Sequence, residues 1–247
     1  MRDLVTERTV LVDTDGVRVG QVNGLVFSST ADRAFGRPVR VTARTHAGSA
    51  GVVNIEREAA LGGSLYTKGV LILTGFLGGH FALEAPLALT ATVTLEQSYT
   101  PIDGDSASST ELYALLSSLS GIPLRQDIAV TGSINQNGEI QPIGGVNLKI
   151  EGFYDVCRAR GLTGTQGVMI PAQNMRDLML RHDVVDAVRR GHFHIYAVSR
   201  IEEGIELLTG KKAGKHIRNR FTPGSIYAIA DRRLRTLYQS QKKAGGQ

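Results

Sequence analysis

The hydrophobic pattern of the chain changes near residue 100, and this change limits the folds that the chain can adopt. Before it, short runs rich in β-branched residues are separated by clusters of Gly, Asp, Ser and Thr, which is typical of strands joined by turns. The predicted strands are 10–12, 17–26, 39–43, 52–56 and 89–96. The stretch 69–82 is apolar enough for a buried helix, but its glycines leave its conformation open.

Helical spacing dominates from residue 110 onward. Leucines at 112, 115, 116 and 119 recur at the i, i+3, i+4 and i+7 positions, and the Gly-Ile-Pro of 121–123 predicts the end of that helix. The preceding Ser-Ser-Thr-Glu of 108–111 fits a capping box. A second amphipathic helix is expected to begin at Asn147, its predicted N-cap, and to end near Gly161.

A β-hairpin is predicted between these two helices, because Asn137-Gly138 favours a type I′ turn between the runs 128–136 and 139–143. After the second helix, strands and helices alternate. The predicted strands are 168–171 and 194–198, and the predicted helical segments are 175–180, 184–190, 201–208 and 225–241. This organisation predicts an α+β protein, an α/β sandwich in which helices pack on a sheet.

Length and composition fit a globular protein with a substantial core. No run approaches the roughly 18 apolar residues of a membrane helix, and Met1-Arg2-Asp3-Leu4 begins no signal peptide. We therefore expect a cytoplasmic protein without a membrane partner. The single cysteine, Cys157, excludes an internal disulfide and is expected to be buried.

Positive charge is concentrated at the C-terminal end. Residues 1–210 carry 18 Lys/Arg against 22 Asp/Glu, whereas residues 211–247 carry 10 against one, Asp231. A helix over 225–241 that docks an apolar stripe and turns its cations to solvent explains this pattern. Binding of a nucleic acid is the second interpretation. The final Ala-Gly-Gly-Gln is expected to be disordered.

Two polar residues at predicted helix starts form a candidate catalytic pair. Ser106 lies in Asp103-Gly104-Asp105-Ser106-Ala107-Ser108 just before the first helix, and Lys149 lies 43 residues later in the first turn of the second. A serine hydroxyl becomes a nucleophile when a base removes its proton, and lysine acts as that base when its amine is neutral. Free N–H groups at the helix start after Ser106 offer an oxyanion site. A helix cap at Ser106 and a solvated Lys149 are the structural alternatives.

Lysine needs a large pKa shift for such a role. Free lysine titrates near ~10.4, so a pKa of roughly 7 to 8 requires a shift of about three units, or about 4 kcal/mol. The helix macrodipole supplies only about 0.3–1 kcal/mol. Desolvation by apolar neighbours, for which Ile143, Val146 and Ile150 are candidates, must supply most of the shift.

These segments resemble the proteolytic domain of the Lon protease family. The 103–108 motif resembles the nucleophile motif of its archaeal-like branch, and Val130-Thr131-Gly132-Ser133 together with the segment from Pro142 to Lys149 resembles the part that carries the catalytic lysine. Residues 69–75 resemble the strand that precedes the proteolytic site, and residues 167–171 resemble a later core strand. The matches follow the family's order over most of residues 15–210.

The resemblance implies a serine endopeptidase that acts on unfolded or flexible polypeptides in protein quality control. Ser106 maps to the nucleophile, Lys149 to the general base, and Thr131 to a threonine that bonds the lysine. Asp105 and Asp103 map to acidic positions that adjust the dyad, in one arrangement by pairing with the lysine. The implied fold is the ribosomal protein S5 domain 2-like proteolytic domain over 1–210, followed by a basic helical extension over 211–247, in a hexameric ring.

The family's energy source is missing from this sequence. Lon proteins couple proteolysis to an ATPase, but no G-x-x-x-x-G-K-[ST] loop occurs here. We interpret the chain as an excised C-terminal domain; the other interpretation is a protease that works without its own ATP hydrolysis. No cofactor or metal is expected in the chain, and ATP and Mg belong to a separate ATPase domain where one exists.

Three rival functions are weaker. His192-Phe193-His194 resembles half of a metal site but has no nearby carboxylate or cysteine in the sequence. No serine lies in a G-x-S-x-G elbow, which disfavours a histidine-based hydrolase, and His80 beside two glycines is a candidate for lining the cleft. A noncatalytic oligomerisation or nucleic-acid-binding module of the same fold, using the basic tail, is the main alternative.

Overall fold

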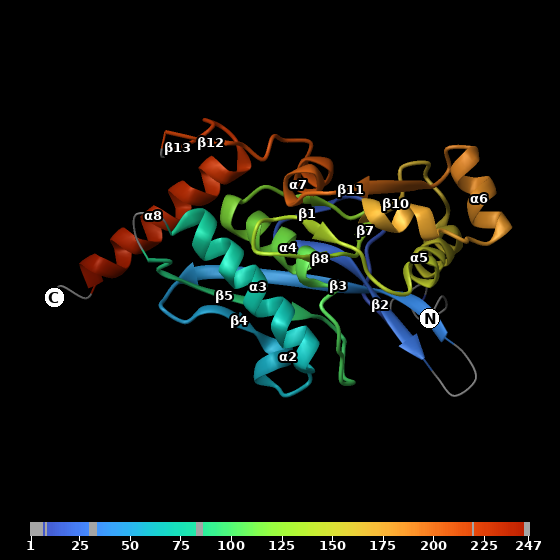
Figure 1. Cartoon of the computed structure of the whole chain (residues 1–247), viewed down its shortest axis with the longest axis horizontal. Helices are drawn as coiled ribbons and strands as arrows, with labels where there is room; N and C mark the ends of the chain where they lie inside the picture. Colours follow the sequence, from blue (N-terminus) through green and yellow to red (C-terminus); the bar gives the residue numbers. More distant parts are fainter. Residues whose placement is uncertain (1–6, 8, 30–33, 83–85, 219, 245–247) are drawn as a thin grey trace.

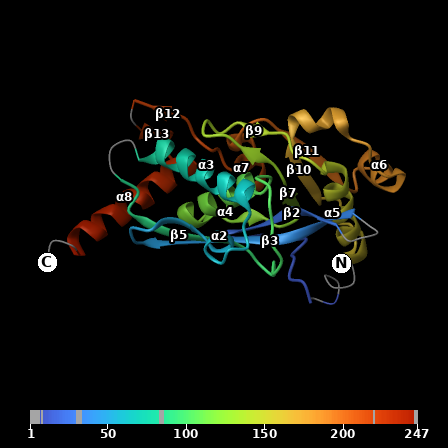
Figure 2. The same ribbon diagram turned by 60° about the horizontal axis from the view of Figure 1, so that its bottom comes forward.

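A seven-stranded mixed sheet runs through the molecule, with helices on both of its faces (Figures 1 and 2). This computed structural model describes residues 7, 9–29, 34–82, 86–218 and 220–244. The predicted features of the first four residues and of the last three lie outside the described residues. Within the described ranges, no helix is both long and apolar enough to cross a membrane.

The elements follow the predicted change from strands to alternating strands and helices. The strands are β1 (Val17–Arg18), β2 (Gln21–Ser29), β3 (Ala34–Ala47), β4 (Gly51–Asn54), β5 (Leu89–Leu95), β6 (Leu124–Arg125), β7 (Ile128–Val130), β8 (Ser133–Ile134), β9 (Ile140–Gln141), β10 (Gly167–Pro171), β11 (His194–Val198), β12 (His216–Ile217) and β13 (Arg220–Phe221). The helices are α2 (Ile55–Glu58), α3 (Ser64–Phe81), α4 (Ser108–Ser120), α5 (Val146–Arg160), the 3₁₀ helix η1 (Ala172–Asp177), α6 (His182–Arg189), α7 (Ile201–Thr209) and α8 (Ile226–Ala244).

The main sheet has the order β11-β10-β7-β2-β3-β5-β4. Successive residues of a strand point to opposite faces, and the two cores divide accordingly. Val22 of β2 lies in the larger core with α3, α4 and α8, whereas Leu25 of the same strand lies in the smaller core with α5. Helices α4 and α5 therefore cover opposite faces of the sheet.

The sheet opens between β2 and β7. The parallel pairing of these strands stops at Asn23↔Ala129 and Gly24↔Val130, although β2 continues beside β3 as far as Ser29. Thr131 follows immediately after β7, so it lies where the two strands separate. A side chain from α5 can reach the α4 side of the sheet through this opening.

Three local predictions were wrong at the helices. The run 69–75, expected to resemble a strand, belongs to the 18-residue helix α3. The capping box at 108–111 does not form: Ala107 is the N-cap of α4, the Ser108 hydroxyl accepts from the Ile134 N–H, and Glu111 turns inward. Asn147 lies inside α5, because Gly145 is its N-cap, and its amide instead bonds the backbone of Asp177 and Met179.

The predictions for short β segments were partly right. Residues 10–12 form no strand in the described part of the chain. The hairpin around Asn137-Gly138 exists as β8 and β9, but its loop has five residues rather than two, with the Asn135 side chain bonding the N–H groups of Asn137 and Glu139. The first part of the run 128–136 is β7 of the main sheet instead.

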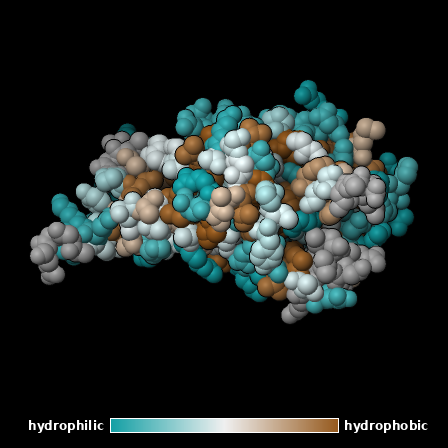
Figure 3. All heavy atoms as spheres, turned by 90° about the horizontal axis from the view of Figure 1, so that it is seen from below, coloured by the Kyte–Doolittle hydropathy of each residue, from teal (hydrophilic) through white to brown (hydrophobic). Residues whose placement is uncertain are grey.

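Helix α8 docks its apolar stripe and exposes its cations, as predicted. Ile226, Ala230 and Leu234 are buried in the larger core, whereas Arg232 and Arg233 are exposed. The end of α8 extends away from the body in both ribbon views (Figures 1 and 2), and this end is hydrophilic in Figure 3. The division at residue 210 stays a prediction, but residues beyond it complete the core of the preceding part.

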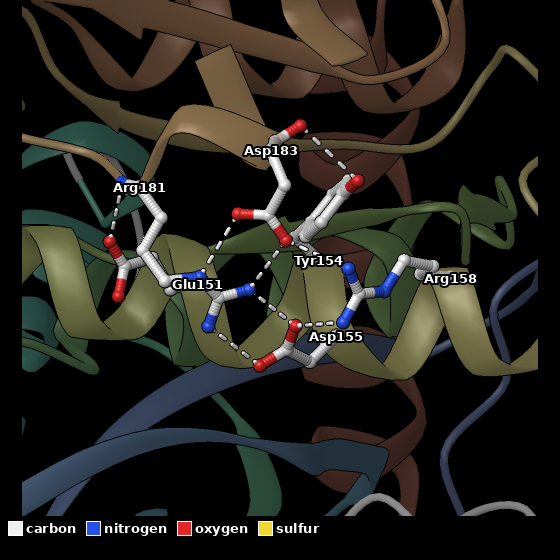
Figure 4. A network of polar contacts seen from close by, with 6 residues as sticks. All are labelled: Glu151, Tyr154, Asp155, Arg158, Arg181 and Asp183. Carbon is white, nitrogen blue, oxygen red and sulfur yellow. Dashed lines mark hydrogen bonds and ion pairs between the residues drawn. The ribbon is translucent and has the colours of Figure 1, made fainter. Parts of the chain in front are cut away.

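An ion-pair network fastens α6 to α5 (Figure 4). The Arg181 guanidinium lies between the carboxylates of Asp155 and Asp183, with nitrogen–oxygen distances of 2.6 Å and 3.1 Å. Arg158 also contacts Asp183, at 2.8 Å. Hydrogen bonds from Arg181 hold the pKa of Asp183 below its ordinary value. These side chains are partly exposed, so the network orients α6 and stabilises it modestly.

Candidate active site

Ser106 and Lys149 meet at the opening of the sheet. The Lys149 Nζ lies 2.9 Å from the Ser106 Oγ and 3.0 Å from the Thr131 Oγ1. Thr131 and Lys149 are each 2 % exposed, whereas Ser106 is partly exposed. The three side chains that were predicted to act together are therefore in contact, with the hydroxyl of the serine accessible from outside.

Two glycines bring Lys149 to this position. Strand β3 crosses α5 so closely that a Cβ on Gly36 would collide with the backbone of Leu148 and Lys149, and a Cβ on Gly152 would collide with the Gly36 carbonyl. Helix α5 therefore packs on β3 by direct contact of the two backbones. This close approach sets how far the lysine reaches through the sheet.

Burial gives Lys149 the property that a general base needs. Desolvation lowers the pKa of its amine to about 8, although the negative charge of Asp105 opposes the shift. Val146 and Ile150, two of the predicted apolar neighbours, are buried on the same helix. The direction and the main cause agree with the expectation from the sequence.

Backbone hydrogen bonds hold the turn that carries Ser106. The Ser106 carbonyl accepts from the Gly132 N–H at 2.9 Å and from the Thr131 hydroxyl at 3.4 Å. The N–H groups of Ser108 and Ser109 donate to the carbonyls of Asp105 and Gly132. In the described part of the chain, the N–H groups of Ser106 and Ala107 have no such acceptor, so they remain available to an incoming oxygen.

The two predicted acidic residues both precede Ser106 but make different contacts. The Asp105 carboxylate accepts from the Ser133 hydroxyl at 2.8 Å, and among the described residues the hydrogen-bond partners of the Lys149 amine are Ser106 and Thr131. The Asp103 carboxylate accepts the N–H groups of Leu65 and Tyr66 at the start of α3. Hydrogen bonds from backbone N–H groups, first that of Gly104, lower the pKa of Asp103.

A cavity of about 780 Å³ opens onto the pair. Its lining includes residues 26–29 of β2, beyond the pairing of this strand with β7, and the strap of residues 100–107 that leads to Ser106. Phe27 of this β2 segment, which is half exposed, and Arg37 on β3 are part of the lining. The sequence analysis missed both residues, because strand periodicity gives no sign of which residues border a gap in a sheet.

Comparison with known proteins identifies the family. Residues 90–210, which include Ser106, Thr131 and Lys149, match the family model of the Lon protease (S16) C-terminal proteolytic domain. The chain belongs to the Lon protease family. A putative Lon protease homolog of Escherichia coli is 44% identical over 210 residues, which are 84% of this chain and 36% of that protein.

Other Lon relatives agree. A putative Lon protease homolog of Haemophilus influenzae is 43% identical over 211 residues, or 85% of this chain and 35% of that protein. The archaeal Lon protease of Pyrococcus abyssi is 32% identical over 212 residues, or 80% of this chain and 18% of that protein. The chain thus spans little more than a third of the length of the Escherichia coli and Haemophilus influenzae relatives.

Two histidines that the sequence marked as candidates, His80 and His194, contact other groups in this Lon-family chain. His80, a candidate for the cleft, instead packs among Phe76, Phe81, Phe221 and Tyr227, and burial lowers its pKa. His194 contacts the Gly164 carbonyl at 2.8 Å. Among the described residues, no group of three or more His, Cys, Asp or Glu side chains is arranged to hold a metal ion.

Proposed function

We propose that the chain is a serine endopeptidase that uses Ser106 as nucleophile and Lys149 as general base. The observation that carries the proposal is the 2.9 Å contact between the Ser106 Oγ and a buried amine whose pKa is about 8. Near neutral pH such an amine is partly unprotonated, and it can accept the hydroxyl proton without a histidine.

The mechanism proceeds through an acyl-enzyme. Lys149 takes the proton of Ser106 as Oγ attacks the carbonyl carbon of the substrate, and it then gives this proton to the leaving amine. A water molecule loses a proton to Lys149 as it attacks the ester, and that proton returns to Ser106. The N–H groups of Ser106 and Ala107, which have no backbone acceptor in the described part of the chain, are the donors that we assign to the oxyanion in both steps.

Thr131 orients the amine in this mechanism. Its hydroxyl lies 3.0 Å from Nζ and can donate to the Ser106 carbonyl, so the neutral amine can donate to Thr131 and keep its lone pair toward Ser106. We predict that Thr131→Val lowers kcat about 10-fold, because a buried N–H loses its acceptor. Steady-state turnover of an unfolded protein measures the effect. Thr131→Ser, the matched control, should keep most of the activity; equal losses in both variants would remove this role.

The pH dependence of turnover should follow Lys149. The amine is inactive while protonated, so kcat/KM is expected to rise tenfold per pH unit at low pH and to level off above about 8. The Asp105 charge raises this pKa, so Asp105→Asn should move the rising limb to lower pH. A profile from about pH 5.5 to about 9.5 measures both. A limb that stays in place in Asp105→Asn would show that Asp105 does not act on the base electrostatically.

The wider properties of a Lon protein are proposals for this chain. We expect unfolded or flexible polypeptides as substrates, because residues 26–28 of β2 line the cavity beyond the pairing with β7, and an extended chain can align with such a strand. We also expect a ribosomal protein S5 domain 2-like fold, a hexameric assembly, a cytoplasmic role in quality control, and an ATPase domain with ATP and Mg in the full-length protein.

One observation favours the noncatalytic alternative. The ten Lys/Arg of 211–247 are exposed, and among the described residues two of them, Lys212 and Arg235, form ion pairs. Such a surface attracts phosphate groups irrespective of sequence. The dyad distinguishes the two functions, because binding of a polyanion gives no reason for a buried lysine beside a serine. Turnover that depends on Ser106 supports the protease.

A further inference from the structure

A buried polar cluster adjoins the proposed active site and has no part in its chemistry. It consists of Asn54, Glu56, Tyr66 and Glu111, each at most 3 % exposed. The Tyr66 hydroxyl lies 2.6 Å from the Glu111 Oε1 and 3.3 Å from the Glu56 Oε2. Tyr66 also lines the cavity of Ser106 and Lys149, so the cluster reaches the wall of that site.

The start of α3 braces the strap 100–107 that leads to Ser106. The Gly63 N–H donates to the Ile102 carbonyl, and Asp103 accepts from the N–H groups of Leu65 and Tyr66. One turn later, Gly69 leaves room for the backbone of Asp105. A movement of this part of α3 therefore moves the strap.

Tyr66 links that brace to α4. Glu111 lies in the first turn of α4, the helix that follows Ser106 and Ala107 in the chain. Its Oε1 accepts hydrogen bonds from the Tyr66 hydroxyl and from the Asn54 Nδ2. Asn54 also donates to the Tyr66 hydroxyl at 2.8 Å. The start of α3, which holds the strap 100–107, is thus joined to the start of α4 through the Tyr66 hydroxyl group.

The two carboxyl groups of the cluster differ in environment. Glu56 Oε1 accepts from the Thr94 hydroxyl at 2.7 Å and from the Leu95 N–H at 2.8 Å. Burial of Glu111 raises the pKa of its carboxyl group to about 7. Hydrogen bonds from Tyr66 and Asn54 lower this pKa, whereas the negative charge of Glu56 raises it further. Glu56 therefore has two donors outside the cluster, whereas Glu111 Oε1 accepts from Tyr66 and Asn54 within it.

A single proton on Tyr66 cannot serve both carboxylates. When Glu111 is protonated, it can donate to the Tyr66 oxygen, which frees the phenol proton for Glu56. When Glu111 is ionised, its carboxylate and that of Glu56 compete for the Tyr66 proton, and the charge of Glu56 disfavours the buried charge on Glu111. Separation of the α3 start from α4 relieves this repulsion because it admits water.

We propose that Glu111 and Tyr66 are positioning residues that hold the strap 100–107 tightly while Glu111 is protonated and loosen it when Glu111 ionises. The effect on catalysis rests on the proposed protease function, because the strap carries the approach to Ser106. The effect on the strap itself does not depend on the proposed protease function. Asn54, Glu56, Tyr66 and Glu111 are the groups through which the switch acts, from β4, α2, α3 and α4.

Hydrogen exchange measured by mass spectrometry tests the proposal without turnover. Exchange of peptides covering 61–67 and 100–107 is followed at about pH 6 and about pH 8.5 and corrected for intrinsic rates, in the wild type and in Glu111→Gln. The amide that this substitution introduces can donate to Tyr66 and accept from Asn54, but it does not ionise. We expect the wild-type-to-variant ratio of exchange rates to rise about fivefold or more between the two pH values. A ratio that is the same at both pH values overturns the proposal.

Two further variants keep the result interpretable. Tyr66→Phe removes a donor that favours the charged form of Glu111. The pH at which hydrogen exchange of the two peptides becomes faster, the exchange step, should therefore be higher in this variant. An exchange step at the same pH as in the wild type counts against the proposal. Glu58→Gln, which neutralises an exposed carboxyl on α2, should leave the step in place. If turnover is present, the Glu111→Gln to wild-type ratio of kcat/KM should rise over the same pH range. An exchange step in a protein without turnover supports the brace and rejects the protease.

Discussion

Ser106→Ala and Lys149→Ala are each expected to abolish turnover of an unfolded protein, with losses of at least about 1,000-fold. The two losses should be similar and should not add in the double variant, because nucleophile and base act in one step. The 2.9 Å contact between their side chains is the basis of this expectation. Degradation of a labelled unfolded protein, followed by release of small peptides, measures it.

Two control variants separate a base from a positive charge. Lys149→Arg keeps a cation but cannot become neutral at working pH, so it is expected to be as inactive as Lys149→Ala. Lys68→Ala, which removes an exposed lysine of α3, should turn over substrate at the wild-type rate. Substantial activity in Lys149→Arg would mean that the lysine acts by charge alone.

Gly152→Ala is expected to disable the site without touching it. The new methyl would collide with the Gly36 carbonyl on β3, so α5 must shift away from the sheet and carry Lys149 with it. A displacement of about 1 Å costs on the order of 100-fold in rate, and overpacking of this kind destabilises the fold by about 1–3 kcal/mol. Turnover and chemical denaturation of the same preparation measure the two effects.

Gly78→Ala is the matched control for that substitution. Gly78 lies in α3, and a Cβ there meets no atom within 4 Å. Alanine also has the higher helix propensity, so the variant should keep its activity and gain up to about 1 kcal/mol of stability. Wild-type turnover in Gly152→Ala would contradict the account of how α5 is positioned.

Much of the fold could be predicted from local patterns. The leucine spacing and Gly121 located α4, because an amphipathic helix and a left-handed C-cap both leave signatures over a few residues. The start of the same helix could not be predicted. Ser108 and Glu111 have cap-like identities, but tertiary contacts to Ile134 and Tyr66 use their side chains instead.

The candidate site shows the same division. The sequence indicated Ser106, Thr131 and Lys149 through motifs, and the structure brings these residues together. The sequence contained no sign of the features that bring these residues together. These features are the close approach of the glycine-bearing backbones of β3 and α5, the gap between β2 and β7, and the link from Tyr66 to Glu111. Each of these features depends on two partners far apart in the chain that no local pattern relates.

Labelling with a fluorophosphonate, followed by peptide mapping, tests the central claim most directly. The reagent forms a stable bond with a serine oxygen only when the hydroxyl is activated. The account predicts one adduct, on Ser106, with a labelling rate that rises with pH toward about 8, as the Lys149 amine loses its proton, and that is lost in Lys149→Ala. An unlabelled Ser106, or labelling that persists without Lys149, would contradict it.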